Sequence, residues 1–405
     1  MANALITVDE LTAESQRVLH QTCNFIGTID RQYEDRFAKE GGKIGSTLRI
    51  RKPNEYVVRT GKVLDVQHQA ETYDTLTVAT QKGVDMVFDS SELTLSIDRF
   101  SERYIQPAIK RLAANIEADA LSMYKSVYNQ VTPVTPTNAL DFATVGQANR
   151  KLVEGLAPMG DWVLNLNPRQ NQDFISDVKS LFHDSEGIKK QYREGKMGRT
   201  AAFDVYQNTN MGRHTQGAGN TAYTTSTQTG TIPASSATAI DEITVASGSG
   251  IVKKGDVFTI GNVFRVHPET KVSTGELQQF TVTADTASGA GDWAITPSII
   301  TGGAKQNVTI PTTSATAAIT LGTASKNSDL GLAYHPTAFT FVSADLVMPD
   351  GVDFKARQVV DNISMRVVRQ YDINNDQMPM RIDILYGYLA TRPELATRLG
   401  SRVDA

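Results

Sequence analysis

A change of composition in the middle of the chain, reversed about a hundred residues later, constrains the fold most. From Thr215 to Ile240 the sequence has no charged residue and consists mainly of Thr, Ser, Ala and Gly. Short β-like segments follow, separated by turn residues at the spacing of a small sandwich or barrel. They are EITVAS, DVFTIGNVFRV, LQQFTVTADT, WAITPSII and NVTIP. The pattern ends at TASKNSDLGLAY, so we predict that residues 213–330 form a β-domain inserted into a host domain at two neighbouring surface points.

The host carries one long helical pattern before the insert. In IDRFSERYIQPAIKRLAANIEADALSMYKSVY, apolar residues recur three or four apart from Ile97 to Val127. A helix of that length would extend over ~45 Å. Pro107 either starts the regular helix or kinks it, because proline cannot donate a hydrogen bond to the preceding turn. We predict a long backbone helix within residues 91–130.

Residues 131–212 alternate between strand and helix patterns. After two prolines the chain restarts at Asp141, which suits a helix N-cap. DWVLNLNP is a strand pattern, RQNQDFISDVKSLF a helical one, and GKMGRTAAFDVYQNTNM a turn followed by a strand. The alternation predicts a mixed α/β region rather than a helical bundle.

The chain before the long helix divides into two parts. Residues 1–40 show an amphipathic helical stripe that either packs on its own domain or reaches a neighbour. Residues 41–90 alternate at strand period in STLRIRKPNEYVVRTG and TYDTLTVATQKGVDMVF, with polar KVLDVQHQAE between them. We predict a long two-stranded excursion with a mobile tip. A lone hairpin is marginally stable in water, so we expect it to lie on another subunit.

Residues 331–405 return to strand patterns. These are TAFTFVSADLVMP, ISMRVVRQYDI and MPMRIDILYGY, the last two joined by NNDQ. The final strand runs into Arg392-Pro393-Glu394 and a short helical turn. We expect this strand to close a sheet and the Arg-Pro-Glu step to turn the chain onto a subunit surface.

Bulk composition excludes several classes of protein. The 405 residues are 40% apolar and 21% charged, which is ordinary globular usage, and 40 Lys+Arg against 44 Asp+Glu give a net charge of -4. Such a balance provides no global basic field for nucleic acid. The single cysteine, Cys23, excludes an intramolecular disulfide and favours a small buried hydrophobe. No secretory leader or membrane-length apolar run is evident, so we expect a soluble protein made in a reducing cytoplasm.

The motifs that could carry chemistry fail on spacing or context. GGKIGST (41–47) resembles a phosphate loop but precedes an extended segment, so a hinge for the excursion is favoured. DINNDQMPMRID (372–383) lacks the glycine and the flanking helices of a calcium loop, which favours a turn. The six histidines are scattered without metal-ligand spacing. We therefore predict no catalytic, cofactor or metal site, and no enzyme activity.

Basic residues gather on the predicted excursion: Arg49, Arg51, Lys52, Arg59 and Lys62. A solvated strand face would account for them. Alternatively, they complement acidic residues of a neighbouring subunit, because a protruding hairpin has little local surface to pair with. Nucleic-acid contact ranks third, since few aromatic residues are interleaved.

The order of these parts resembles the major capsid (coat) protein of tailed double-stranded-DNA bacteriophages, most closely the podophage subgroup with an inserted β-barrel. RYIQPAIKRLAANIEADAL looks like the spine helix, and WVLNLNPRQNQDF resembles the step into the axial domain. GIVKKGDVFTIGNVFRV is similar to the first strands of the inserted barrel, and DILYGYLATRPELATRLG to the C-terminal strand and turn. The likeness lies in the order of these segments along most of the chain.

The resemblance implies an α+β capsid fold with a specific division of the chain. The expected parts are an N-terminal arm (1–40), an extended β-hairpin loop with adjoining strands (41–90), the spine helix of a peripheral domain (91–130), the first part of an axial domain (131–212), an inserted β-barrel (213–330) and return strands (331–405).

The same resemblance implies a function and partners. The expected product is an icosahedral phage head of hexamers and pentamers around double-stranded DNA, assembled on a scaffolding protein, with a portal protein at one vertex. The expected location is the virion, after synthesis in the bacterial cytoplasm. Contacts between copies are expected at Arg49, Arg51, Arg59, Lys62, Arg392 and Glu394.

A second class of function is a carbohydrate-binding or adhesion protein that acts through the β-domain at 213–330. Such a domain would need an exposed aromatic cluster, and its Trp293 and Tyr223 lie far apart in the sequence. The Thr, Ser and Ala content suits a stabilising or decorating insert better.

Overall fold

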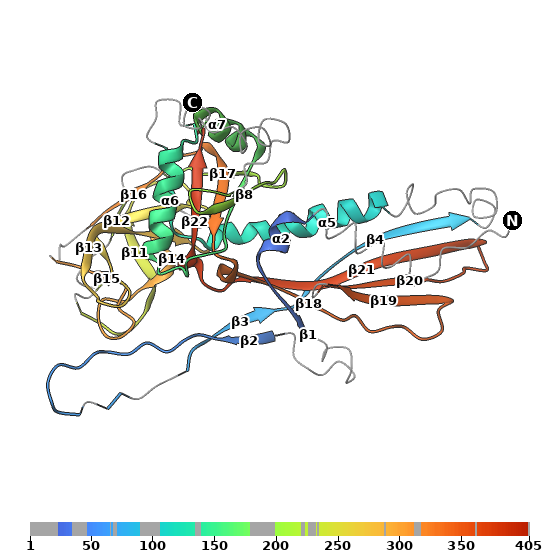
Figure 1. Ribbon diagram of the computed structural model, residues 1–405, viewed down its shortest axis with the longest axis horizontal. Helices are drawn as coiled ribbons and strands as arrows, with labels where there is room; N and C mark the ends of the chain where they lie inside the picture. The colour runs from blue at the N-terminus through green and yellow to red at the C-terminus, as the bar shows by residue number, and fades with distance from the viewer. Residues whose placement is uncertain are drawn as a thin grey trace. The chain divides into compact units, whose positions relative to one another are not determined.

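The computed structural model shows a strand-dominated α+β fold, as predicted (Figure 1). It describes residues 23–34, 47–64, 66–67, 71–89, 106–133, 139–178, 199–219, 223–225, 232, 235–286, 289–311, 317–360 and 363–403. These residues form two compact units, each assembled from three separate chain segments. Unit 1 contains the described residues within 1–50, 73–122 and 339–391, and unit 2 contains those within 51–72, 123–338 and 392–405.

Unit 1 is built around one long strand, β21 (Gln377–Ala390). One edge of β21 pairs antiparallel with β4 (Thr80–Asp89) along ten residues. The other edge pairs first with β20 (Ile363–Arg369) and then with β18 (Phe339–Ala344). Strand β19 (Phe354–Val360) pairs with β20. The predicted return strands are confirmed, and the segment joining β20 to β21 is a turn in which the Asp372 carboxylate accepts the backbone N–H of Asn374 at 3.0 Å.

The prediction of a helical segment over residues 1–40 is wrong at Asp30–Glu34, which form a strand. Helix α2 covers only Asn24–Thr28, and β1 (Asp30–Glu34) pairs in parallel with β18. The short helix is held by buried Glu117, whose carboxylate accepts the Phe25 N–H at 2.6 Å. Backbone pairing along β18 outweighs the weak helical periodicity of this stretch. Residues 1–22 and 35–46, including the GGKIG part of the predicted hinge, lie outside the described residues.

The predicted burial of Cys23 is confirmed. Its thiol donates to the carbonyl of Ala113 at 3.8 Å, and burial, followed by the nearby Glu117 carboxylate, raises its pKa to about 12. The thiolate is therefore suppressed at physiological pH, and the side chain acts as a small apolar group.

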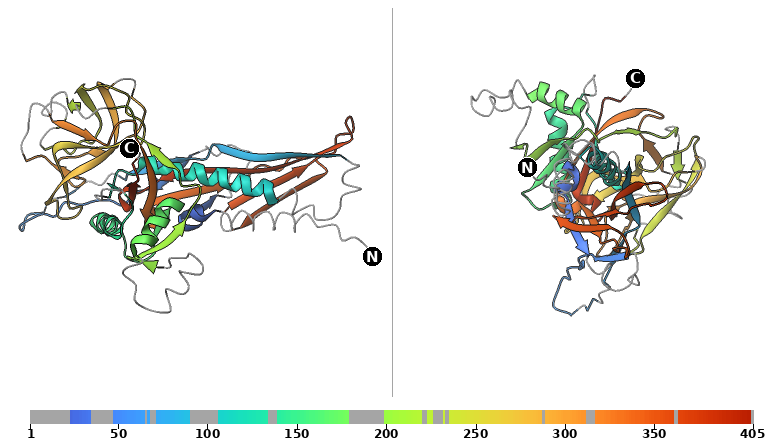
Figure 2. Two further views of the ribbon diagram at one scale, coloured as in Figure 1. Left: turned by 90° about the horizontal axis from the view of Figure 1, so that it is seen from above. Right: turned by 90° about the vertical axis from the view of Figure 1, so that its right-hand side faces the viewer.

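The long helix is α5 (Gln106–Leu121), 16 residues or ~24 Å as described. It lies along the long strands of its unit and packs on β4 and α2 (Figures 1 and 2). Its buried stripe of Ile109, Leu112, Ile116 and Ala120 follows the predicted spacing, but the chain then tightens into a 3-10 turn, η2 (Ser122–Ser126). Residues 90–105, where the rest of the helical pattern falls, are outside the described part.

The base of the predicted excursion is a two-stranded sheet of β2 (Thr47–Arg51) and β3 (Tyr73–Thr77). Leu76 and Val78 are buried against Val342 and Ala344 of β18, with Leu48 and Ile50 packed around them. The alternation read from the sequence therefore places one face of the hairpin base on its own unit. Residues 52–64 leave the strand pattern.

Unit 2 contains a second mixed sheet. Its strands run in the order β5 (Gln130–Val131), β22 (Ala396–Ser401), β17 (Asn327–Tyr334), β6 (Trp162–Leu166), β8 (Phe203–Gln207) and β7 (Arg199–Thr200). Helix α6 (Phe142–Glu154) packs on β22 and β17, and α7 (Pro168–Val178) packs on β17. The predicted N-cap is confirmed, because the Asp141 carboxylate accepts the Thr144 N–H at 2.8 Å.

The expectation that the Arg-Pro-Glu step turns the chain onto a surface is wrong. A 3-10 turn, η4 (Pro393–Leu395), leads directly into β22, and every residue of β22 is buried. Strand β22 pairs antiparallel with β17 and in parallel with β5, so it lies inside the sheet. Small and apolar side chains in Ala396, Leu399 and Gly400 allow that position.

The predicted insert is a closed barrel. Strands β12 (Val257–Val266), β13 (Ser273–Val282), β14 (Gly291–Ile299), β11 (Ile240–Ser247), β10 (Tyr223–Thr225) and β16 (Ala318–Leu321) pair in a ring, because β12 pairs with both β13 and β16. Strand β15 (Val308–Thr309) pairs with β12. The barrel has its own apolar core around Phe258, Phe280 and Trp293. The two short strands β10 and β16, which close the ring, carried no clear strand pattern in the sequence.

Candidate functional site

The predicted contact residues of the excursion are exposed, and the structure places them on two features. Arg49 and Arg51 lie two residues apart on β2, where Arg49 stacks over the Tyr73 ring at 4.7 Å and Arg51 pairs with Glu71 at 3.4 Å. Arg59 and Lys62 lie in the segment beyond the strand, and the Arg59 guanidinium bonds the carbonyl of Gly61. Three of the four, Arg49, Arg51 and Arg59, thus have local partners on the hairpin or on its loop.

The segment beyond β2 also exposes large apolar side chains, which the sequence analysis did not predict as contacts. Val58 is 89% exposed and Val63 84%, and Tyr56, Leu64 and Val66 are also exposed. We call the part of residues 51–67 that the structure describes the extended loop. A row of exposed valine, leucine and tyrosine side chains on a segment without a core of its own is typical of an interaction surface.

The extended loop and the residues that follow it contact the barrel of their own unit through long side chains. Lys271 Nζ lies 3.4 Å from the Glu55 carboxylate, and Lys305 Nζ lies 3.4 Å from the Thr72 hydroxyl. Glu55 and Lys305 are exposed and Lys271 is partly exposed, and contacts between such flexible side chains contribute less than about 1 kcal/mol each.

Of the remaining predicted contact residues, Arg392 is the N-cap of the 3-10 turn η4 and Glu394 lies within it, and both are half-buried. The Arg392 N–H donates to the Ala338 carbonyl at 3.1 Å, and the Glu394 carbonyl accepts from the Asn129 side chain at 3.4 Å. Their backbones therefore connect η4 to its own unit.

The barrel leaves and rejoins the host through two adjacent strands. Strand β9 (Arg213–Thr215) pairs antiparallel with β17 before the chain enters the barrel. The Ser325 N–H donates to the Gly217 carbonyl at 2.9 Å, so the entering and returning segments lie side by side. This agrees with the expectation that the insertion points are close together.

A buried arginine ties the barrel to the host sheet. Arg398 of β22 is 1% exposed; its guanidinium donates to Val127 O at 2.6 Å on the host and to Gly255 O at 2.6 Å and Thr281 Oγ1 at 3.1 Å on the barrel. Burial lowers its pKa to about 10, so the side chain remains charged near neutrality. A buried charge is tolerated only where its hydrogen-bond donors are satisfied. The barrel therefore supplies acceptors that this host residue needs in order to stay charged.

A hydrogen-bonded chain lies next to this arginine. The Tyr124 ring faces the Arg398 guanidinium at 5.6 Å, and its hydroxyl lies 3.2 Å from His214 Nδ1. His214 Nε2 lies 2.9 Å from Asp256 Oδ1. Asp256 is fully buried, and its other oxygen accepts the N–H groups of Gly217 and Lys253 at 2.9 Å. We call Tyr124, His214, Asp256 and Arg398 the junction cluster.

Further side chains outside the junction cluster also join the barrel to the host. The Gln279 amide of β13 both accepts from Gln130 N–H and donates to Gln130 O at 2.9 Å, as a neighbouring strand would. On α6, Lys151 pairs with Glu276 of the barrel at 2.8 Å, and Glu154 with Arg265 at 3.0 Å. The hydrogen bond from Lys151, followed by that from Arg150, holds the Glu276 pKa below its usual value.

Sequence reasoning missed the junction cluster. Arg398 stands in a short segment that reads as a surface turn, and its partners are carbonyl groups distant in sequence. Asp256 gave one weak signal, since it follows KKG directly before a strand and so marks a tight turn.

The aromatic pair considered for ligand binding lies inside the barrel. Trp293 and Tyr223 are each 1% exposed, and their rings pack edge to face with centroids 5.0 Å apart. A carbohydrate platform requires exposed ring faces, so these two residues belong to the barrel core.

In the described stretches, no helix is both long and apolar enough to cross a membrane.

The model of the P22 coat protein family, described as P22 coat protein, gene protein 5, matches residues 23–399 of this chain. No curated protein sequence is significantly similar to it.

Solved structures that match most of this chain include chains from three phages. A chain of Mycobacterium phage Che8 is 12% identical, with a TM-score of 0.46, and the match covers 91% of this chain and 88% of that one. The mature capsid of bacteriophage PhiM1 gives 12% identity and a TM-score of 0.43, covering 92% and 85%. The capsid of Ralstonia phage GP4 gives 8% identity and a TM-score of 0.45, covering 95% and 92%.

Proposed function

Because this chain belongs to the P22 coat protein family, we propose that it is the major capsid protein of a tailed phage and assembles into the hexamers and pentamers of an icosahedral head. The observation that carries the proposal is the family match, which extends from residue 23 to residue 399 and so includes both units and the barrel. A structural, capsid-forming role follows from the family, and the capsomer geometry is our extension of it.

The extended loop supports a mechanism of self-association. Its exposed apolar side chains include Val58, Val63 and Leu64. Burial of these side chains against a neighbouring copy would be favourable, because it removes apolar surface from water. Arg59 and Lys62 lie among them and provide charges that an acidic patch of the neighbour could match. Repeated use of one such contact around a symmetry axis produces a closed ring.

We also propose the division of the chain into functional parts. Residues 1–40 serve as the N-terminal arm, 41–90 as the extended hairpin loop with adjoining strands, and 91–130 as the spine helix. Residues 131–212 and 331–405 supply the axial and return strands around the insert at 213–330. Arg49, Arg51, Arg392 and Glu394 are proposed contacts between copies.

The proposed partners follow from the same role. The shell would assemble on a scaffolding protein, carry a portal protein at one vertex and enclose double-stranded DNA in the virion, after synthesis in the host cytoplasm. A net charge of -4 suits a container, because strong basic contacts would grip the packaged polyanion and hinder its entry and release.

Electron microscopy tests the proposal directly. The full chain would be expressed alone and together with a candidate scaffolding protein, and the particles imaged after size-exclusion chromatography. Closed shells of uniform size are the expected result. Small monodisperse particles under both conditions would contradict it.

A further inference from the structure

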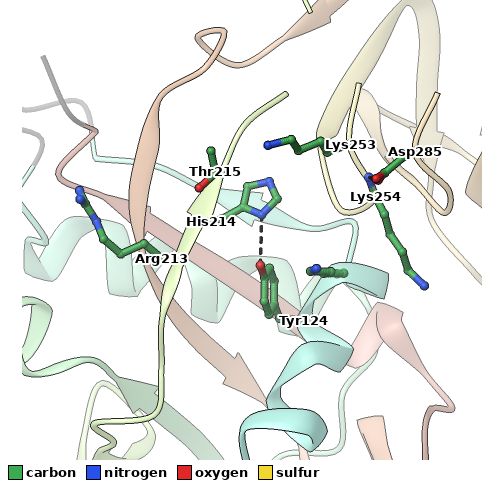
Figure 3. A pocket seen from close by; sticks show the side chains of 8 residues that line it. Tyr124, Arg213, His214, Thr215, Lys253, Lys254 and Asp285 are labelled. Atoms are coloured by element: carbon green, nitrogen blue, oxygen red, sulfur yellow. Dashed lines mark hydrogen bonds between the residues drawn. The ribbon is translucent and has the colours of Figure 1, made fainter. Parts of the chain in front are cut away.

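A recessed cationic pocket lies beside the junction cluster, between β9 of the host and two turns of the barrel (Figure 3). Its volume is about 260 Å³. Its lining combines three lysines, an arginine and a histidine with a single carboxylate. The residues are Tyr124, Lys125, Arg213, His214, Thr215, Lys253, Lys254 and Asp285.

The charges of this pocket are unequally compensated. Arg213 is paired with buried Asp329 at 2.8 Å, and His214 is bonded to Tyr124 and Asp256. By contrast, across the ranges that the structure describes, no carboxylate lies within ion-pair distance of the ammonium groups of the three lysines. Three like charges around one hollow repel each other, and that repulsion is relieved by an anion between them.

The backbone that carries two of these lysines is fixed. The Lys253 N–H donates to Asp256 and the Lys254 N–H to Asp285 Oδ1 at 2.7 Å. Gly255 then adopts a φ of +96°, and a side chain there would meet Lys125, so glycine allows the barrel turn to approach the host lysine closely. In Figure 3, Lys253 extends over the His214 ring, whereas the Lys254 side chain points away, which places it at the rim.

We propose that this pocket binds a compact multivalent phosphate, such as inorganic pyrophosphate, and that the bound anion braces the barrel against the host. The volume lies below the roughly 300–1,000 Å³ of pockets for drug-sized ligands, so it suits a small anion. Lysine ammonium groups bind phosphate as point charges. Lys125 belongs to the host and Lys253 to the barrel, so one anion would bridge the two. The proposal does not depend on shell assembly.

Calorimetric titration of inorganic pyrophosphate into the full chain, at constant ionic strength in chloride, tests the site. We expect one saturable site per chain and a higher thermal midpoint when it is filled. Lys253→Gln should weaken binding about tenfold, since it removes one adjacent unit charge. Asp285→Asn should tighten binding several-fold, because it removes the only carboxylate of the lining while retaining an acceptor for Lys254 N–H.

The matched control is Lys110→Gln, which removes another exposed lysine, from α5 of the other unit. It should leave pyrophosphate affinity unchanged. Lys253 and Lys110 are both exposed, so neither substitution should prevent folding, and circular dichroism verifies this. Three results would each overturn the proposal: no saturable binding, equal affinity in Lys253→Gln and Lys110→Gln, or saturable binding of a single-stranded oligonucleotide in place of pyrophosphate. None of them would affect the coat-protein assignment.

Discussion

The barrel and the extended loop both depart from the host fold, yet they are stabilised in different ways. The barrel closes on its own apolar core and joins the host through buried, hydrogen-bonded side chains, including Arg398 and Asp256. The extended loop has exposed valines and contacts the barrel of its unit through partly exposed ion pairs, such as that between Glu55 and Lys271 at 3.4 Å. A segment of the first kind belongs to the stability of the subunit, whereas one of the second kind is suited to contacts between subunits.

Excision of the barrel should have the largest effect on stability. Residues 218–324 can be replaced by a short Gly-Ser linker, because Gly217 and Ser325 are already hydrogen bonded to each other. The host would then lose two acceptors of Arg398, and we expect aggregation or mis-assembly of the expressed chain. Sedimentation and electron microscopy are the measurements. Normal shells from the shortened chain would show that the barrel is dispensable.

A single substitution in the junction cluster should have the next largest effect. Arg398→Met leaves Val127 O and Gly255 O buried without these donors, and it should lower the free energy of unfolding by about 3 kcal/mol. Urea unfolding of the full chain measures this. Arg381→Met is the control, since Arg381 forms an exposed pair with Asp85 and should cost less than about 1 kcal/mol. Equal losses in both variants would argue against the importance of the junction.

A smaller and pH-dependent effect is expected at Glu276. The pKa of this carboxyl is lowered in the folded state by Lys151 and Arg150, so its contribution to stability is present above the ordinary pKa of the unfolded chain. Glu276→Gln should therefore lower stability near neutral pH, by less than about 1 kcal/mol because the group is partly exposed. The difference should vanish as the pH falls through the lowered native pKa. A difference that grew in acid would contradict this account.

Changes in the extended loop should affect subunit stability least. Val58→Asp and Val63→Asp replace exposed side chains, and each should change the free energy of unfolding by less than about 0.5 kcal/mol. The yield of shells, measured by sedimentation with scaffolding protein present, should nevertheless fall sharply, because a charge must be buried at the proposed contact. Val272→Asp alters an exposed barrel valine and serves as the control. Undiminished shell yield in both loop variants would remove the loop from the proposed interface.

Local patterns in the sequence predicted those features that depend on neighbouring residues. The cap at Asp141, the buried stripe around Leu112 and Ile116, and the hairpin base at Leu76 all follow from short-range periodicity. The strand Asp30–Glu34 could not be predicted this way, because its pairing partner lies some three hundred residues later in the chain. The burial of Arg398 was hidden for the same reason, since its acceptors are backbone carbonyls of distant segments.

The position of β22 limits the order in which the chain can fold. This strand lies between β5 and β17, so the sheet of unit 2 lacks an internal strand until residues 396–401 have been synthesised. The barrel, whose strands lie between residues 223 and 321, can close well before that. A nascent coat subunit therefore carries a finished barrel on an unfinished host. A chain still on the ribosome cannot complete the host sheet, so in the proposed shell a subunit would be ready to join only after translation has passed that strand.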